Sequence, residues 1–330
     1  MSTTAIRRTR PAVAAAMGLG VGLVVAIVVL AFLWPVATSE PHDLPVGVVG
    51  GKLPRGTDVS VDATSYETRA DAVRAIEERE VYGAYVMSPD ALEVLIAGAG
   101  QAAASAIVEG LGTQLSVTQG VTPTVTDVVP LSSGDPAGSG LSAMGFPLVL
   151  GGIVGGVLVS LLVAGVTRRL LALGAYAFAA GLLAAVVTGP ILGITDGSFW
   201  TDALVLGVAM LGTASTVAGL NALLGTAGTG VGAAITMLIA NPISGGAMPY
   251  QFITGPWGEI GQYFVPGAAQ TLFRKVNYFP DASTLHEWLV LFTWIVGGVA
   301  LSLVGHFRSS TPVHLPDNEL EEAPEGAHLA

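Results

Sequence analysis

The chain has 330 residues, of which 52% are hydrophobic and 11% charged, and its formal net charge at pH 7 is −11. A typical soluble domain carries roughly 25% charged residues, so the composition argues against a soluble globular protein. The acidic balance argues against a nucleic-acid partner, because such partners bind clustered lysine and arginine. Cysteine is absent, which excludes disulfides, thiolate metal sites and cysteine nucleophiles.

Long uncharged runs predict an α-helical polytopic membrane protein whose first partner is the lipid bilayer. A helix needs about 20 apolar residues to cross a hydrocarbon core of about 30 Å. The stretch 203–258 alone contains no Asp, Glu, Lys or Arg. Six transmembrane helices are predicted, at 14–36, 144–166, 171–193, 203–224, 230–249 and 287–306. The first is expected to be an uncleaved anchor, because its Trp34-Pro35 end lacks a small-x-small cleavage site.

Basic residues near the helix ends predict the orientation. They are Arg7, Arg8 and Arg10 before the first span, Arg168 and Arg169 between the second and third, and Arg308 after the sixth. An even number of crossings places all of them on one side, which the positive-inside rule makes the cytoplasm. We therefore expect a multi-pass plasma-membrane protein with a cytoplasmic N-terminus (1–13) and an acidic cytoplasmic tail (309–330).

Residues 37–142 follow the first span and are predicted to form an extracytoplasmic α/β domain inserted between helices 1 and 2. Short apolar or alternating runs predict strands at 45–50, 58–62, 82–87, 92–96 and 124–131. Helices are predicted over 66–80, with Ser65 as the N-cap, and over 101–115. Residues 132–140 are rich in Gly and Ser and predict a flexible hinge into the membrane.

No motif predicts catalysis, a metal or a cofactor. His42 has no second histidine at metal-ligand spacing, and Gly50-Gly-Lys52 lacks the rest of a phosphate loop. Ser139 does not match the Gly-x-Ser-x-Gly pattern of a nucleophile elbow. We expect no enzymatic activity in this chain. The charged residues of the last outside region are expected to be solvated at the membrane interface; they are Glu259, Asp281, His286 and Glu287.

The five-helix transmembrane domain, 143–308, contains one informative interruption. Pro242 cannot donate a backbone hydrogen bond and disfavours helix at Asn241. Such a break survives at membrane depth when it is buried in protein or lines a wet cavity, and Asn241 and Ser244 are suitable polar partners. The aromatic stretch at about 250–284 is predicted to be a re-entrant or interfacial helical pair. An ordinary loop with an aromatic belt at headgroup level is the alternative.

The order of these segments resembles the ABC-2 type permease superfamily, especially the branch related to phage-infection membrane proteins. The residues that carry the resemblance are Pro45–Gly50, Arg74–Pro89, Asn241–Gly245, and Phe264–Ala268 followed by Tyr278–Pro280. The resemblance covers almost the whole chain. It implies one span, a large outside domain, and five further spans with re-entrant elements before the last.

The resemblance also implies a function. The chain would be the permease subunit of an exporter, acting as a homodimer or with a related permease half and moving a hydrophobic or amphipathic compound outward. A separate cytoplasmic ATPase would supply the energy. The residues expected along the substrate path are Asn241, Pro242, Ser244, Gly245, Tyr263 and Pro266.

Arg168 and Arg169 are the expected ATPase contact, although their loop is shorter than the coupling helix that the family usually has there. Simple positive-inside anchoring is the alternative role for the two arginines. For the whole chain, the alternative is a non-transporting cell-surface protein whose outside domain binds a partner or assists envelope assembly.

Overall fold

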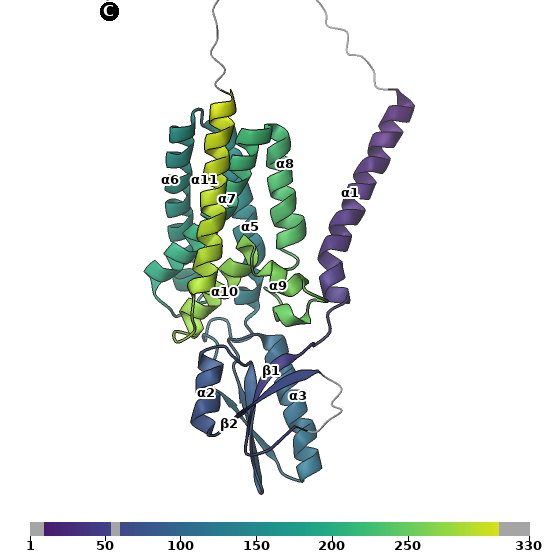
Figure 1. The fold of residues 1–330 in the computed structure, drawn as a ribbon, viewed down its shortest axis with the longest axis vertical. Helices are drawn as coiled ribbons and strands as arrows, with labels where there is room; N and C mark the ends of the chain where they lie inside the picture. Colours follow the sequence, from purple (N-terminus) through teal and green to yellow (C-terminus); the bar gives the residue numbers. More distant parts are fainter. Residues whose placement is uncertain (1–9, 54–59, 310–330) are drawn as a thin grey trace, which may run out of the picture.

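The computed structural model describes residues 10–53 and 60–309, so the predicted N-terminal residues 1–9 and tail residues 310–330 lie outside the described part. The bundle helices are α5 (Gly145–Leu162), α6 (Val166–Val186), α7 (Phe199–Leu224), α8 (Thr226–Ala234) and α11 (Leu285–Ser309). Figure 1 shows a small α/β domain at one end of this bundle and one helix, α1 (Pro11–Ala37), standing apart from it.

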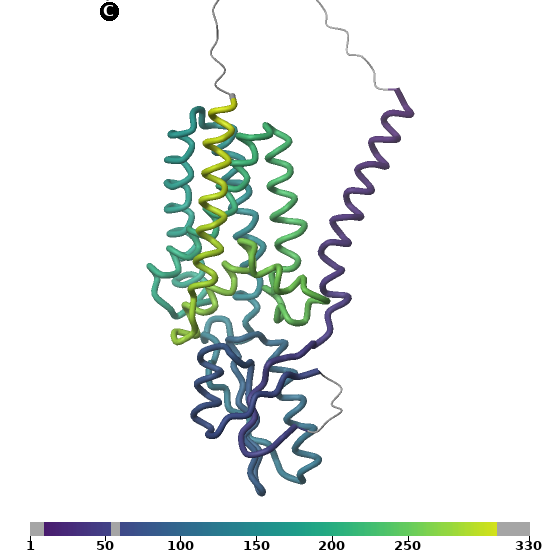
Figure 2. The backbone as a smooth tube through the Cα atoms, viewed as in Figure 1, coloured from purple at the N-terminus to yellow at the C-terminus, as the bar shows by residue number. Residues whose placement is uncertain are grey.

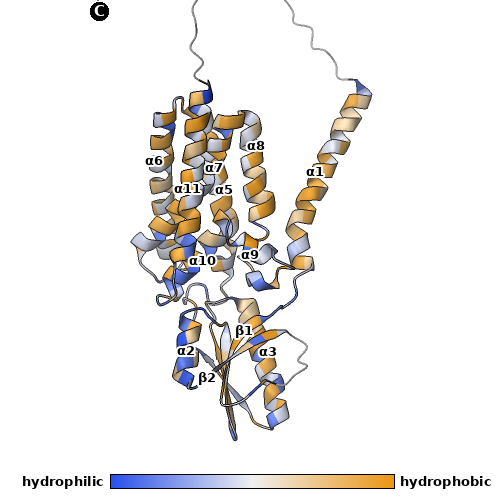
Figure 3. Cartoon of the chain, viewed as in Figure 1, coloured by the Kyte–Doolittle hydropathy of each residue, from blue (hydrophilic) through white to orange (hydrophobic). Residues whose placement is uncertain are grey.

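Five helices among the described residues are long and apolar enough to cross a membrane. They are Pro11–Ala37, Ser139–Leu162, Val166–Ile191, Phe199–Leu224 and Leu285–Arg308. Helix α1 and the bundle helices are coloured mostly as hydrophobic in Figure 3. The fifth predicted span, 230–249, is replaced by a shorter apolar segment, Thr226–Ala240, in which α8 continues as the π-helical turn η2 (Ile235–Ala240). At about 1.5 Å per residue this segment reaches roughly 22 Å, so a sixth crossing stays a prediction.

The α/β domain contains one mixed sheet in the order β2-β1-β3-β4-β5 within the described residues. Its strands are β1 (Leu44–Val49), β2 (Val61–Tyr66), β3 (Gly83–Ser88), β4 (Ala91–Ile96) and β5 (Pro123–Asp127). β3 and β4 are antiparallel, and the other neighbours are parallel. Helix α3 (Ala102–Gln119) covers one face of the sheet and α2 (Arg69–Glu77) the other.

Two predictions for this domain are wrong in detail. Ser65 does not cap a helix, because it pairs with Val48 in the β1–β2 ladder. Helix α2 starts later, where the Thr68 hydroxyl accepts a hydrogen bond from the Asp71 amide at 3.1 Å. The predicted strand at 58–62 lies partly outside the described residues, and the observed strand continues to Tyr66.

The predicted hinge at 132–140 is held in place. Asp135 is buried and accepts hydrogen bonds from the backbone amides of Gly140 and Leu141, at 3.1 and 2.8 Å. These amides belong to the first turn of α4 (Ser139–Ala143), which leads into α5. An Asp carboxylate is favourable at this position because the first amides of a helix have no partner within the helix.

Helix α7 is the centre of the bundle. Of an 18-residue apolar stretch of α7, 78% is buried, against 22–39% for the corresponding stretches of the other membrane-length helices of the bundle. Small residues allow its neighbours to approach closely: Gly156 of α5 lies against Ala214, Gly181 of α6 against Gly207, and Gly298 of α11 against Ser215. In a membrane, where no hydrophobic effect drives helices together, such close packing stabilises the bundle.

The aromatic segment forms two short helices, α9 (Trp257–Gly261) and α10 (Val265–Tyr278), preceded by the 3-10 turn η3 (Tyr250–Phe252). The turn between α9 and α10 enters the bundle. Val265 packs in the core beside Ala209 and Met210, near the middle of α7, and the Tyr263 carbonyl accepts a hydrogen bond from Trp294 Nε1 at 2.8 Å. The backbone trace in Figure 2 shows this segment between the bundle and the sheet. The arrangement agrees with a re-entrant pair, whose depth in a bilayer stays a prediction.

Gly298→Ala is expected to destabilise the bundle, because the added Cβ would overlap the backbone of Ser215. Overpacking at such a contact costs about 1–3 kcal/mol. Gly297→Ala is the control, since a Cβ there meets nothing within 4 Å and alanine favours a helix over glycine by about 0.5–1 kcal/mol. Thermal unfolding of the purified chain in detergent measures both. Equal midpoints for the two variants would contradict this packing.

Candidate functional site

The predicted helix break is present. Helix α8 and its continuation η2 end at Ala240, and a turn follows over 241–243. The backbone carbonyl of Asn241, where the helix does not continue, accepts hydrogen bonds from the Ser244 hydroxyl at 2.7 Å and from the Ser244 amide at 3.2 Å. Gly245 then takes a positive φ of 72°, a conformation that glycine adopts without the steric cost of a side chain.

Polar side chains from three parts of the chain hold this turn; we call them the break network. Gln270 Nε2 donates to Ser244 Oγ at 3.0 Å, and Gln262 Nε2 donates to the Ser244 carbonyl at 2.9 Å. Thr271 donates to Gln262 Oε1 at 2.8 Å. From the α/β domain, Gln101 donates to the Gly245 carbonyl at 3.0 Å. The network therefore joins the helix break to α10 and to the α/β domain.

A cavity of about 390 Å³ lies between the α/β domain and the bundle, and a second cavity of about 240 Å³ lies beside the break. We call them the junction cavity and the break cavity. The break cavity is lined by Phe32 and Val36 of α1, by the start of α5, and by the turn itself. Four predicted path residues line it: Asn241, Pro242, Ser244 and Gly245.

The remaining path residues are placed elsewhere. Tyr263 is exposed and lines the junction cavity, with its ring 5.0 Å from that of His286. Pro266 is buried between α5 and α7. Asn241, one of the two expected polar partners of the break, lines the break cavity, and its side-chain amide makes no hydrogen bond among the described residues. Ser244, the other expected partner, supports the break directly, because its hydroxyl bonds to the Asn241 carbonyl.

The junction cavity is rich in charged groups. Lys275 Nζ lies 2.7 Å from Glu287 Oε1, and both side chains are largely buried. The expectation that Glu287 is solvated is therefore wrong, since it is 4% exposed. Glu80, Glu259, His286 and Arg79 also line this cavity, together with Tyr82, Tyr250 and Phe279. Burial raises the pKa of Tyr82, whose hydroxyl donates to Gln251.

Next to this cavity, Arg274 ties the two domains together. Its side chain is buried, and Nη1 donates to the Ala99 carbonyl at 2.7 Å. Burial, with the nearby charge of Arg79, lowers the pKa of Arg274 to about 9. The guanidinium therefore stays largely protonated at neutral pH.

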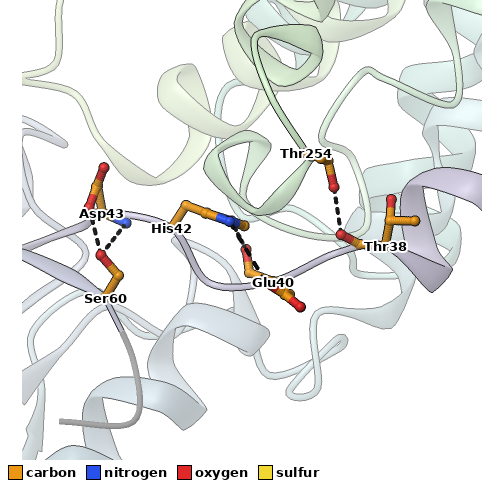
Figure 4. A network of polar contacts seen from close by, with 6 residues as sticks. All are labelled: Thr38, Glu40, His42, Asp43, Ser60 and Thr254. Atoms are coloured by element: carbon orange, nitrogen blue, oxygen red, sulfur yellow. Dashed lines mark hydrogen bonds and ion pairs between the residues drawn. The ribbon is translucent and has the colours of Figure 1, made fainter. Parts of the chain in front are cut away.

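The linker between α1 and the sheet is fixed at both ends (Figure 4). Thr254 donates to the Thr38 carbonyl at 2.6 Å, and Ser60 donates to Asp43 Oδ1 at 2.6 Å. His42 stays beside Glu40 and is half exposed. No group of three or more potential metal ligands occurs among the described residues.

The two arginines between α5 and α6 differ in their surroundings. Arg169 Nη2 donates to the carbonyls of Ser160 and Val163, at 3.1 and 3.3 Å, and so caps the end of α5. Arg168 is exposed. Of the expected ATPase contact, only Arg168 presents a side chain that is not already used by the bundle.

The sequence interpretation missed the junction cavity and the glutamines of the break network. Glutamine carries no charge and no motif, so Gln101, Gln262 and Gln270 gave no local signal. Lys275 and Glu287 could have indicated a buried pair, because both lie beside long uncharged stretches where an unpaired charge is costly.

No protein-family model, curated protein or solved structure matches this chain. The described helices define its class, a polytopic helical membrane protein with a small mixed α/β domain.

Ser244→Ala is expected to destabilise the chain by about 0.5–1.5 kcal/mol, because the Asn241 carbonyl loses its hydroxyl donor and Gln270 loses an acceptor. Asn241→Leu is the matched comparison. The Asn241 amide faces a cavity, so its loss should change stability by less than about 0.5 kcal/mol. Thermal unfolding of both purified variants measures the difference. A larger loss for Asn241→Leu would show that the amide, and not Ser244, supports the break.

Proposed function

We propose that the chain is the membrane-spanning permease subunit of an ABC-2 type exporter, and that it moves a hydrophobic or amphipathic compound outward using a separate ATPase. The supporting observation is the helix break after Ala240, held by the break network beside a cavity. Polar side chains and unwound backbone are costly at membrane depth and typically mark a transport pathway.

The break cavity supports the proposed class of substrate. Its walls include apolar side chains of α1, such as Phe32 and Val36, and polar groups of Asn241, Ser244 and Gln270. A molecule with an apolar body and a polar end matches this division. Because α1 stands apart from the bundle (Figure 1), such a molecule could enter from the bilayer between the two.

The outer domain supports a role in release. Gln101 of this domain bonds directly to Gly245 of the break, so a movement of the domain and a change at the break are mechanically linked. A second copy of the chain, or a related permease half, would cover helices that a single chain leaves exposed. In one chain, the apolar stretch of α1 is 0% buried.

The proposed orientation places the α/β domain outside the cell. The start of α1, the connection between α5 and α6, and the end of α11 all lie on the side of the molecule remote from the sheet (Figure 1). Positive-inside bias at Arg10, Arg168 and Arg308 makes that end cytoplasmic.

Single cysteines test this orientation cleanly, because the chain has no native cysteine. Ser65→Cys, on an exposed position of β2, should react with a membrane-impermeant maleimide in intact cells. Thr167→Cys, exposed at the start of α6, should react only after permeabilisation. Labelling of Thr167→Cys in intact cells, with labelling of Ser65→Cys only after permeabilisation, would contradict the proposed topology.

The proposed function itself is tested by purification of the full chain from its native membrane. An ATP-hydrolysing subunit should co-purify, and Arg168→Gln should weaken this association by roughly 10-fold, equivalent to about 1.4 kcal/mol. Arg169→Gln should instead lower thermal stability, because it removes the cap of α5.

Failure of any ATPase to co-purify with the unaltered chain would contradict the exporter proposal and favour a non-transporting cell-surface protein. If an ATPase co-purifies equally with Arg168→Gln, the exporter proposal stands and Arg168 serves only as an anchor.

A further inference from the structure

The junction cavity has room for a small polar ligand. Its volume is about 390 Å³, and liquid water occupies about 30 Å³ per molecule. The cavity lies where the α/β domain meets the bundle, and its walls come from both. The junction cavity is distinct from the break cavity, although Gln262 and Thr271 of the break network also line it.

One wall carries an arginine in an unusual backbone conformation. Arg79 follows the C-cap of α2 and has a positive φ of 59°. Glycine is usual at this position, since a side chain there is sterically strained. Arg79 places its guanidinium 5.1 Å from the centre of the Phe279 ring in the bundle segment. The strain is retained at a position whose side chain lines the cavity, which is typical of functional positions.

The Arg79 side chain is also incompletely paired. Its Nη1 atom is buried and has no hydrogen-bond partner among the described residues. A buried guanidinium N–H group needs an acceptor, and an anionic oxygen makes the strongest hydrogen bond with it. This wall of the cavity therefore favours an anionic group.

Other residues that line the cavity have the reverse requirement. Glu287 is buried, its Oε1 is held by Lys275, and its Oε2 has no partner within the described part of the chain. Glu259 and the exposed side chain of Tyr263 also line the cavity. Carboxylates combined with aromatic rings are typical surroundings of an ammonium group.

We propose that the junction cavity binds a zwitterion in which an ammonium and an anionic group are joined by a short linker. The anionic group pairs with Arg79, and the ammonium lies near Glu287 and Glu259. A simple anion is disfavoured by these carboxylates, and a simple cation leaves Arg79 unpaired. The ligand contacts both domains, so its binding fixes the α/β domain against the bundle.

The first test uses phosphoethanolamine as the probe, with the purified full chain in an uncharged maltoside detergent. Phosphoethanolamine should raise the midpoint of thermal unfolding in a saturable manner. Ethanolamine alone and inorganic phosphate alone, at matched ionic strength, should bind at least roughly 10-fold more weakly. An equal response to either single ion, or no response to phosphoethanolamine, would overturn the proposal.

Substitutions in the junction cavity test whether phosphoethanolamine binds there. Arg79→Gln and Glu259→Gln should each weaken binding by roughly 10-fold or more. Arg74→Gln on the exposed side of α2 and Glu109→Gln on α3 are the controls and should bind normally. Arg79→Gly relieves the backbone strain, so this variant should fold well and still lose binding. Normal binding by Arg79→Gly would overturn the assignment.

Two sources could supply this chemistry, a phospholipid headgroup or a soluble molecule. The chain is placed in phosphatidylglycerol nanodiscs with or without phosphatidylethanolamine. If the lipid is the ligand, phosphatidylethanolamine should stabilise the unaltered chain but not Arg79→Gly, and should abolish the response to soluble phosphoethanolamine. An unchanged response to soluble phosphoethanolamine identifies a soluble ligand.

Discussion

Two phenylalanines attach the α/β domain to the bundle, and both candidate cavities depend on that attachment. Phe252 is part of the hydrophobic core between the sheet and α3, whereas Phe279 is part of the core between the sheet and α2. Both come from the segment that also forms α9 and α10. Burying a phenylalanine contributes about 1.5–3 kcal/mol, and the buried Arg274 adds a direct hydrogen bond to Ala99. The sheet is therefore held on both faces by residues of the membrane domain.

This attachment explains why the polar groups at the junction can be buried. Lys275, Glu287 and Phe279 all line the junction cavity, and the side chains of the ion pair are 16% and 5% exposed, so the same packing shields the charges from water. A buried pair is not by itself evidence of stability, because desolvation can exceed the Coulombic gain. Charged groups retained in this place, with hydrogen-bonding atoms left unpaired, indicate selection for binding more than for stability.

The coarse architecture could be predicted from the sequence because its signals are local. Uncharged runs mark the long helices, and short apolar runs bounded by Pro and Gly mark strands such as β1. The start of α2 was misplaced since Ser65 and Thr68 are both acceptable N-caps. The reciprocal hydrogen bonds of Thr68 and Asp71 favour the later start. Residues 132–140 looked flexible because their composition is that of a linker, yet Asp135 finds helix amides to bind.

The cavities could not be predicted in the same way. Arg79 and Glu287 are far apart in the sequence, and only the docking of two domains brings them to one cavity. The break itself was predictable from Pro242, whose chemistry is local. Its partners were not, because Gln101 and Gln270 reach it from elements that the sequence alone does not place. Local patterns thus define elements, whereas sites formed between elements require the three-dimensional packing.

The separate position of α1 has a consequence for how the membrane acts on the protein. Its 27 residues extend about 40 Å at about 1.5 Å per residue, which exceeds a hydrocarbon core of about 30 Å. A helix that is too long for its bilayer tilts. Trp34 meets Trp257 near the end of α1 that adjoins the α/β domain. Because Phe32 and Val36 line the break cavity, a change in the tilt of α1 would change the width of that cavity, and the thickness of the bilayer would then act on it.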